Sequence, residues 1–158
     1  MNIDGVKVKE LKVIPDERGK LFEILRRDDE MFTGFGQAYI TTCKPGVIKA
    51  WHHHKHQTDN FCPLNGKTQV GLYDAREDSP TCGTSMSLEV DPAAQPILIQ
   101  IPPGVLHGMT PLEDSEVMLL NIPTNTYNYD SPDEFREPFD KFPDFEWKTP
   151  VGLTPVQG

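Results

Sequence analysis

The sequence predicts an all-β protein, and three observations support this fold class. Short apolar or alternating segments recur along the chain, turn-forming residues separate them, and no long segment shows the apolar repeat of an amphipathic helix. Prolines, 15 in 158 residues, are spread along the chain, which is typical of turns between short elements rather than of a disordered linker. We therefore expect an antiparallel sandwich or barrel of strands.

Eight segments have the apolar content or the alternation of β-strands. In chain order they are residues 6–14, 21–25, 36–42, 47–51, 67–73, 84–90, 96–101 and 116–122. Clusters of Pro, Gly, Asn and Asp mark turns between several of them, at residues 15–19, 44–46, 64–66 and 102–104. This spacing favours strands joined by short turns over alternating strands and helices.

The C-terminal part is expected to be mostly irregular. Ser131 and Pro132 are the residue types that begin helices, so a short helix is predicted there. Beyond it, four aromatic residues are separated by prolines and acidic residues: Phe139, Phe142, Phe145 and Trp147. We expect this segment to lie over the barrel.

The length of the chain predicts a single domain over residues 1–158. We place the barrel core at about residues 20–125 and the C-terminal cover at residues 126–158. A chain of this size buries about 70% of the surface that it exposes when unfolded, so its core needs no disulfide or structural metal.

Composition limits the partners and the compartment. With 24 acidic and 15 basic residues, the net charge of −9 argues against a nucleic-acid partner or an anionic membrane surface. The N-terminus has no apolar signal segment, and no run approaches the about 20 apolar residues of a membrane span, so we expect no membrane partner. The three cysteines form no C-x-x-C pair, which favours the reducing cytoplasm.

Four of the five histidines lie within residues 52–56, at His52, His53, His54 and His56. Side chains alternate along a strand, so the first, third and fourth of these are expected on one face and His53 on the other. A solvent-exposed polar strand is the simplest interpretation of such a cluster. The distant segment 102–107, which ends in His107, favours a joint site in the barrel instead.

The two histidine segments resemble the paired motifs of the cupin superfamily. The first motif is present with aspartate in place of glutamate, in Gly46, His52, His54, Asp59 and Gly66. Half of the second is kept in residues 102–107. The resemblance implies a double-stranded β-helix, or jelly-roll barrel. In a metal-binding cupin the matching positions supply ligands suited to Zn, Fe, Mn, Ni or Cu. These ligands would be His52, His54, Asp59 and His107.

A longer series of motifs resembles the dTDP-4-dehydrorhamnose 3,5-epimerases, the RmlC-like branch of the cupins. The matching segments follow the order of that family, in residues 16–23, 50–52, 74–76, 79–83, 101–108 and 127–132. The resemblance implies an enzyme of carbohydrate biosynthesis, an epimerase or isomerase that acts on a nucleotide-linked 4-keto-6-deoxy sugar. It also implies that no cofactor takes part.

Proton abstraction next to a ketone needs a base, an acid on the opposite face, and donors at the enolate oxygen. By resemblance, His52 is the base, Asp140 holds its imidazole, and Tyr129 protonates the other face, with Tyr127 as the alternative acid. Arg18 would help to hold the nucleotide diphosphate, because a guanidinium suits phosphate oxygens. The other residues expected at the substrate are Glu23, Lys49, His54, Asp59 and His107.

Two positions depart from the family pattern. Asp59 stands where the family has its active-site lysine, and Lys49 stands where it has an arginine. The usual cation at the enolate oxygen is therefore missing, and Lys55 faces away from His52 and His54 by strand parity. With a metal ion bound, Asp59 would be a ligand and the ion would replace the lysine. Without one, Asp59 would act as a second base or accept a hydrogen bond from the sugar.

Three functions stay open at this point. One is the nucleotide-sugar epimerase or isomerase. The second is a metal-dependent cupin enzyme that uses the His/His/Asp/His site on a different small molecule. The third is a cupin that binds a sugar nucleotide without catalysis. The family resemblance also implies a homodimer, for which the alternating segment at residues 6–11 would suit a strand exchanged between subunits.

Overall fold

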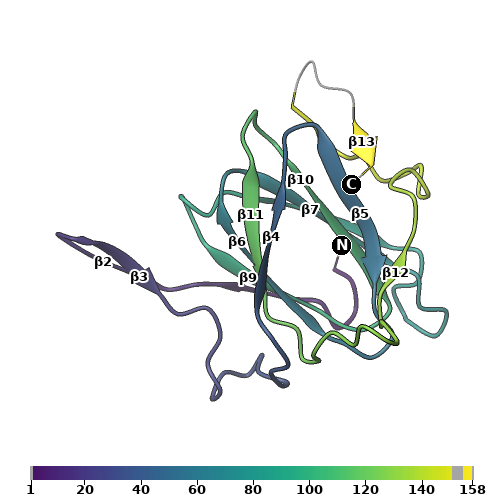
Figure 1. The fold of residues 1–158 in the computed structure, drawn as a ribbon, viewed down its shortest axis with the longest axis horizontal. Coiled ribbons are helices and arrows are strands. Elements are labelled where there is room, and N and C mark those ends of the chain that lie inside the picture. Colours follow the sequence, from purple (N-terminus) through teal and green to yellow (C-terminus); the bar gives the residue numbers. More distant parts are fainter. Residues whose placement is uncertain (1, 151–154, 158) are drawn as a thin grey trace.

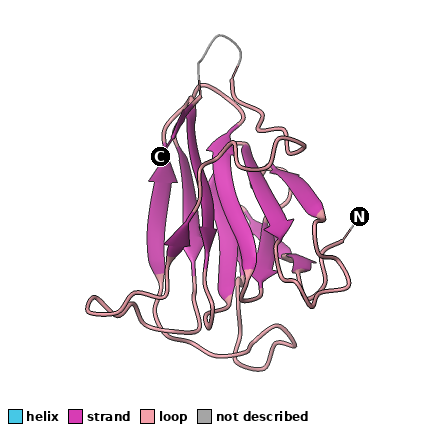
Figure 2. Ribbon diagram, turned by 90° about the vertical axis from the view of Figure 1, so that its right-hand side faces the viewer, coloured by secondary structure: helices cyan, strands magenta, loops and turns pink. Residues whose placement is uncertain are grey.

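The computed structural model describes residues 2–150 and 155–157, and its regular elements are strands (Figures 1 and 2). They are β1 (Lys7–Glu10), β2 (Val13–Asp16), β3 (Gly19–Phe22), β4 (Tyr39–Cys43), β5 (Val47–His53), β6 (Asp59–Asn65), β7 (Thr68–Asp74), β8 (Ser85–Val90), β9 (Ile97–Ile101), β10 (Val105–Pro111), β11 (Val117–Asn121), β12 (Phe135–Arg136) and β13 (Val156–Gln157). The all-β class is confirmed. The prediction of a short helix at Ser131 is wrong, because residues 131–134 are irregular and lead into β12.

Two sheets face each other to form the jelly-roll sandwich (Figure 2). The first has the order β1-β9-β6-β11-β4. The second has the order β12-β5-β10-β7-β8, and β13 pairs with β5 at its edge. Most neighbours in each sheet are distant in the sequence, as the cupin resemblance implies. The hairpin β2–β3 belongs to neither sheet and projects away from the sandwich (Figure 1).

The main core fills the space between the two sheets. In β11, for example, Val117 and Leu119 are buried, while Met118 and Leu120 are only partly buried. This is the alternation expected of a strand with one inner face. The core residues come from both sheets: Cys43, Phe61, Val70, Leu72, Val90, Ile99, Ile101, Val105, Met109, Val117 and Leu119, together with Ile3. Burial of these side chains is the main force that holds the sheets together.

The C-terminal segment covers the outer face of the second sheet, as predicted. Trp51 of β5 contacts Phe145 and Trp147 at ring-centroid distances of 4.9 and 4.8 Å, and its Nε1 donates to the Phe139 carbonyl at 3.1 Å. Gly71 is required below this cluster, because a Cβ there would lie 2.5 Å from the Trp147 ring. The aromatic residues therefore anchor an irregular segment by packing rather than by strand pairing.

The N-terminal region covers the first sheet. A second apolar cluster on its outer face contains Leu11, Met31, Cys62 and Leu98. The segment predicted to exchange between subunits forms β1, which pairs with β9 of its own chain. The proposed division into a core at about residues 20–125 and a cover at 126–158 stays a prediction, and residues 151–154 and 158 lie outside the described part. Among the described residues, none belongs to a helix long and apolar enough to cross a membrane.

Two strands that the sequence pattern did not predict, β6 and β10, lie in the interior of the two sheets. Nearly every residue of both strands is buried, so neither shows the alternation of a half-exposed strand. Each strand also contains a proline, Pro63 or Pro111, a residue type that is rare in interior strands. Both strands matter for function, because β6 begins with Asp59 and β10 carries His107.

Candidate active site

A large cavity of about 1180 Å³ opens between the sheets, with space for a sugar nucleotide. Strands β5, β6, β10 and β11 contribute to its wall, as do residues 35–41 and 124–136. His52, His54 and His56 line it, whereas His53 stacks on Phe135 at a ring-centroid distance of 5.2 Å. The predicted alternation of the histidine cluster is therefore confirmed.

His107 reaches the same cavity from the neighbouring strand. It pairs directly with His52 in the register of β10 and β5, so the two motifs that lie far apart in sequence meet at one site. The His107 ring is buried, with its centroid 5.5 Å from that of His54 and 5.1 Å from that of Phe61. Burial lowers the pKa of His107 to about 4, so the ring is neutral near pH 7.

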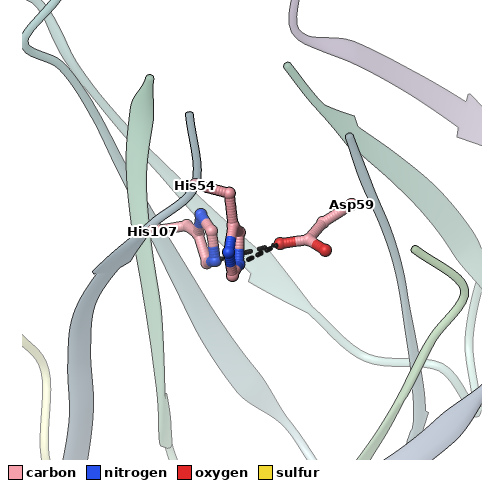
Figure 3. A group of neighbouring side chains, drawn as sticks. All are labelled: His54, Asp59 and His107. Atoms are coloured by element: carbon pink, nitrogen blue, oxygen red, sulfur yellow. Dashed lines mark ion pairs between the residues drawn. The ribbon is translucent and has the colours of Figure 1, made fainter. Parts of the chain in front are cut away.

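Asp59 is buried, 1% exposed, and faces His54 and His107 (Figure 3). Its Oδ2 is 3.1 Å from His54 Nε2 and 3.2 Å from His107 Nε2. Burial opposes ionisation of Asp59, but the two imidazoles outweigh it and lower the pKa of the carboxyl group. Burial likewise opposes the charge on His54, but Asp59 outweighs it and raises the pKa of that imidazole.

His52 lies outside this group and has a different carboxylate beside it. Glu134 Oε1 is 3.8 Å from His52 Nδ1, within ion-pair range but beyond a hydrogen bond. Burial lowers the pKa of His52, and the charge of Glu134 opposes this only in part. Asp140, expected to hold the His52 imidazole, is exposed and is not among the residues that line the cavity. In the described structure the carboxylate beside the His52 imidazole is therefore that of Glu134 and not that of Asp140.

Three tyrosines line the cavity. Tyr129 is 87% exposed, and its ring centroid lies 4.9 Å from that of Tyr127 in the same segment. Tyr39, from β4, accepts a hydrogen bond from Asn121 Nδ2 at 2.9 Å through its hydroxyl group. Tyr129, the predicted acid, thus borders the site, and the neighbouring Tyr127 could take its role.

The expected substrate-binding cations are divided between the cavity and the surface. Lys49 lines the cavity, and its Nζ donates to Thr41 Oγ1 at 2.8 Å. Arg18 does not reach it: this residue follows β2 in the projecting hairpin, with a side chain 82% exposed and paired with Asp16 at 2.6 Å. Glu23, next to the hairpin, pairs with an exposed arginine instead. Within one chain, these two predicted residues are not brought to the site.

The predicted metal ligands are only partly brought together. Among the described residues, the group whose ligand atoms lie within 4.8 Å of one another is His54, Asp59 and His107. His52 was also expected as a ligand, but it is not part of this group, and its ring centroid lies 6.5 Å from that of His107. Three of the four predicted positions therefore form one cluster, and the fourth remains available for another role.

Sequence reasoning missed several residues that shape the site. Gln57 Nε2 and Asn121 Nδ2 donate to Asp59 Oδ1 at 2.8 and 2.9 Å. Asp133 accepts hydrogen bonds from the backbone N–H groups of residues 55–57 and so holds the turn after His54. Of these residues, only Asn121 could have been found from the sequence. The alternation of β11 places it on the inner face of the strand, where a polar side chain needs a buried hydrogen-bond partner.

The sequence comparisons identify the family. Residues 14–135 match the family described as "Polysaccharide biosynthesis C-terminal domain". The chain is 41% identical over 141 residues to the probable low-salt glycan biosynthesis epimerase Agl13 of Haloferax volcanii, covering 88% of this chain and 90% of that protein. It is also 42% identical over 148 residues to the spore coat polysaccharide biosynthesis protein SpsL of Bacillus subtilis, covering 93% and 97%.

The solved structures agree with this assignment. A dTDP sugar isomerase from Desulfovibrio desulfuricans superposes with a TM-score of 0.84 at 31% identity, covering 92% of each chain. The RmlC epimerase of Mycobacterium tuberculosis, at 21% identity, shares the fold with a TM-score of 0.87 over 100% of this chain and 82% of its own. The chain belongs to the polysaccharide biosynthesis C-terminal domain family, among the RmlC-like sugar epimerases.

Proposed function

We propose that this enzyme epimerises a nucleotide-linked 4-keto-6-deoxy sugar by removing a proton from a carbon next to the ketone. The observation that carries the proposal is His52, whose imidazole lines a cavity of about 1180 Å³ and is free of the Asp59 cluster. Relatives described as a glycan biosynthesis epimerase and a dTDP sugar isomerase support the same reaction class and substrate. The proposed proton transfers use side chains of the chain and no organic cofactor.

His52 is the proposed base. Burial lowers its pKa, so the imidazole is neutral near pH 7 and able to accept a proton. Glu134, 3.8 Å away, would stabilise the imidazolium that forms, the role that the family resemblance gave to Asp140. Glu134 is itself held by Arg136, whose Nε donates to Oε1 at 2.8 Å. The carboxylate is therefore fixed in position before the substrate binds.

Tyr129 is the proposed acid. Inversion of a carbon requires that the proton returns to the face opposite the base, so base and acid must come from different walls of the cavity. His52 comes from β5, whereas Tyr129 belongs to the segment 124–136 that borders the opening. Tyr127 is the alternative in the same segment. Closure of this segment over a bound sugar would also exclude water from the enolate.

A nucleotide diphosphate is anionic and needs basic side chains at its binding site, although the chain as a whole is acidic. Lys49 and Arg136 are the Lys and Arg residues that line the cavity in the described structure. We propose that they contact the diphosphate. Arg18 and Glu23 remain part of the proposal only through a homodimer, in which the projecting hairpin of one subunit would reach the cavity of the other.

The homodimer is supported by the exposed apolar side chains of the hairpin. Ile14 and Leu21 are 51% and 58% exposed and pair with each other across β2 and β3. Such a surface is usually covered by a partner. Sedimentation at micromolar concentration tests this, and a monomer would contradict it. A cytoplasmic location completes the proposal; its support is that Cys43, Cys62 and Cys82 are free thiols.

The reaction is tested by solvent exchange. The protein is incubated in D₂O with a dTDP-linked 4-keto-6-deoxy sugar, and deuterium at C3 and C5 is followed by NMR. We expect exchange by the wild type, and a reduction of about 10²- to 10⁴-fold in His52→Asn, because the base is lost. In Tyr129→Phe, exchange should persist while inversion is lost, since the base still forms the enolate.

His53→Asn is the matched control, because this neighbouring histidine stacks on Phe135 outside the cavity. It should exchange at the rate of the wild type. If His52→Asn exchanges as fast as His53→Asn, His52 is not the base. If the wild type exchanges no proton with dTDP-, UDP- or GDP-linked keto sugars, the proposed function is wrong.

A further inference from the structure

The histidines beside Asp59 are held in one tautomer by their outer nitrogens. His54 Nδ1 contacts the Asp133 carbonyl oxygen, and His107 Nδ1 lies 3.1 Å from the Val105 carbonyl oxygen. A backbone carbonyl only accepts hydrogen bonds, so each Nδ1 carries the hydrogen. In a neutral ring Nε2 is then the nitrogen with the lone pair, and in both histidines this atom faces Asp59.

Both nitrogens face a carboxylate oxygen that lacks a donor. Both Nε2 atoms lie 3.1–3.2 Å from Asp59 Oδ2 (Figure 3). Oδ1 of the same carboxylate accepts two amide hydrogen bonds, whereas Oδ2 is the buried side-chain atom that has no hydrogen-bond partner in the described structure. Three atoms that can bind a metal ion thus converge in a buried place. A buried carboxylate oxygen without a donor is unfavourable unless a cation lies beside it.

Neither the lysine nor the arginine of the described cavity wall lies beside this oxygen, because both are bound elsewhere. Lys49 Nζ is bound by Thr41 Oγ1 and the Thr42 carbonyl, at 2.8 and 3.1 Å. Arg136 is paired with Glu134. We propose that His54, Asp59 and His107 bind a divalent first-row transition metal ion. Two ligand atoms at about 2.0–2.2 Å from one ion lie roughly 3–3.5 Å apart, in agreement with the separations of Oδ2 from the two nitrogens.

The surroundings have the features of a supported metal site. Metal-binding imidazoles usually donate their other N–H to a carbonyl, and ligand carboxylates are usually hydrogen-bonded themselves, as here. Two imidazoles and one carboxylate suit Zn, Fe, Mn, Co or Ni and leave coordination positions open. When bound, such an ion is a Lewis acid for a carbonyl oxygen, at the position where the family has its lysine. His52, outside the cluster, remains available as the base.

Metal titration tests the inference without substrate. The full-length protein is stripped with a chelator, dialysed at pH 8 and titrated with Co²⁺ and Zn²⁺. We expect one equivalent per chain by calorimetry, visible d–d absorption bands for Co²⁺, and a rise in Tm of about 5 °C at saturating metal. In Asp59→Asn, of nearly the same shape, the bands should disappear and the affinity should fall at least about 100-fold.

Two further variants make the result decisive. His53→Gln changes a neighbouring histidine outside the cluster and should bind like the wild type. His54→Gln removes a different ligand and should lose the metal, so it settles the question if Asp59→Asn fails to fold. Uptake below 0.1 equivalent by the wild type, or equal binding by Asp59→Asn, would overturn the proposal. Solvent exchange with chelator present tests the proposed reaction separately, so failure of one leaves the other standing.

Discussion

Two buried aspartates in this protein have opposite surroundings. Asp74, at the end of β7, is 0% exposed and accepts hydrogen bonds at both oxygens: Arg76 donates to each, and Ser79 and Thr81 donate to Oδ2 at 2.5 and 2.7 Å. Asp59, at the start of β6, is 1% exposed, and its Oδ2 lies near the Nε2 atoms of His54 and His107 without a hydrogen-bond partner in the described structure. Hydrogen bonds thus fully compensate the cost of burying the carboxylate at Asp74, but only part of that cost at Asp59.

The difference separates structural motifs from functional ones. The segments 74–76 and 79–83 match the family pattern as closely as the histidine segments do, yet they form a self-contained network that binds the N-terminal segment through Arg76 and the Asp4 carbonyl at 2.7 Å. A carboxylate with a complete set of donors has no capacity left for a ligand. A buried carboxylate oxygen that lacks a donor can still bind a ligand.

The largest expected effect is on stability, in Asp74→Asn. The substitution leaves the Arg76 guanidinium without its partner and removes an acceptor for Ser79 and Thr81. We expect the free energy of unfolding to fall by about 2–3 kcal/mol, measured by urea denaturation, while metal uptake by the folded variant is unchanged. Asp114→Asn, at an exposed aspartate, is the control. A loss below about 0.5 kcal/mol would mean that the network is not structural.

The same network predicts how stability depends on pH. Burial opposes ionisation of Asp74, but Arg76, Ser79 and Thr81 outweigh it and lower the pKa of the carboxyl group far below its ordinary value. Its stabilising contribution is therefore complete above the unfolded-state pKa of about 3.9 and is lost as the pH falls toward the folded-state value. The difference in unfolding free energy between wild type and Asp74→Asn should shrink from about pH 5 to pH 3. A constant difference would contradict this.

The fold was predictable where one face of a strand is solvent-accessible or where packing residues are distinctive. The half-buried alternation of β8 and the aromatic series that packs on Trp51 were both visible in the sequence. Strands β6 and β10 were not, because interior strands buried on both faces have no alternation to detect.

The site was predictable to the extent that motifs carry it. His52 and His107 pair across neighbouring strands, and both were identified from spacing and resemblance. Glu134 was not, because it reaches His52 through the pairing of β12 with β5, a contact between segments about 80 residues apart that no local pattern records. The family resemblance indicated Asp140 instead, although that residue is exposed on the C-terminal cover.

A smaller effect is expected in Asp133→Ala. Its carboxylate accepts the N–H groups of Lys55, His56 and Gln57, at 2.8–3.2 Å, and so fixes the turn between His54 and Asp59. Water replaces part of this set, so we expect a loss of about 1 kcal/mol of unfolding free energy. The affinity for Co²⁺ should fall about tenfold, because the turn positions a ligand. Asp130→Ala changes an exposed residue of the same segment and should alter neither the unfolding free energy nor the Co²⁺ affinity. If both variants have the same effects, Asp133 does not support the metal site.

The smallest effect on stability is expected in Asp59→Asn, and its sign is the informative part. In chelator the wild-type Oδ2 faces the Nε2 atoms of both histidines without a hydrogen-bond partner in the described structure. Asparagine places an N–H donor there, while its oxygen can still accept from Gln57 and Asn121. The metal-free variant should therefore be as stable as the wild type within about 1 kcal/mol, or more stable, by urea denaturation. Added Zn²⁺ should stabilise only the wild type. A loss as large as that of Asp74→Asn would show that Asp59 already has a donor in the metal-free protein, and the contrast between the two aspartates would fail.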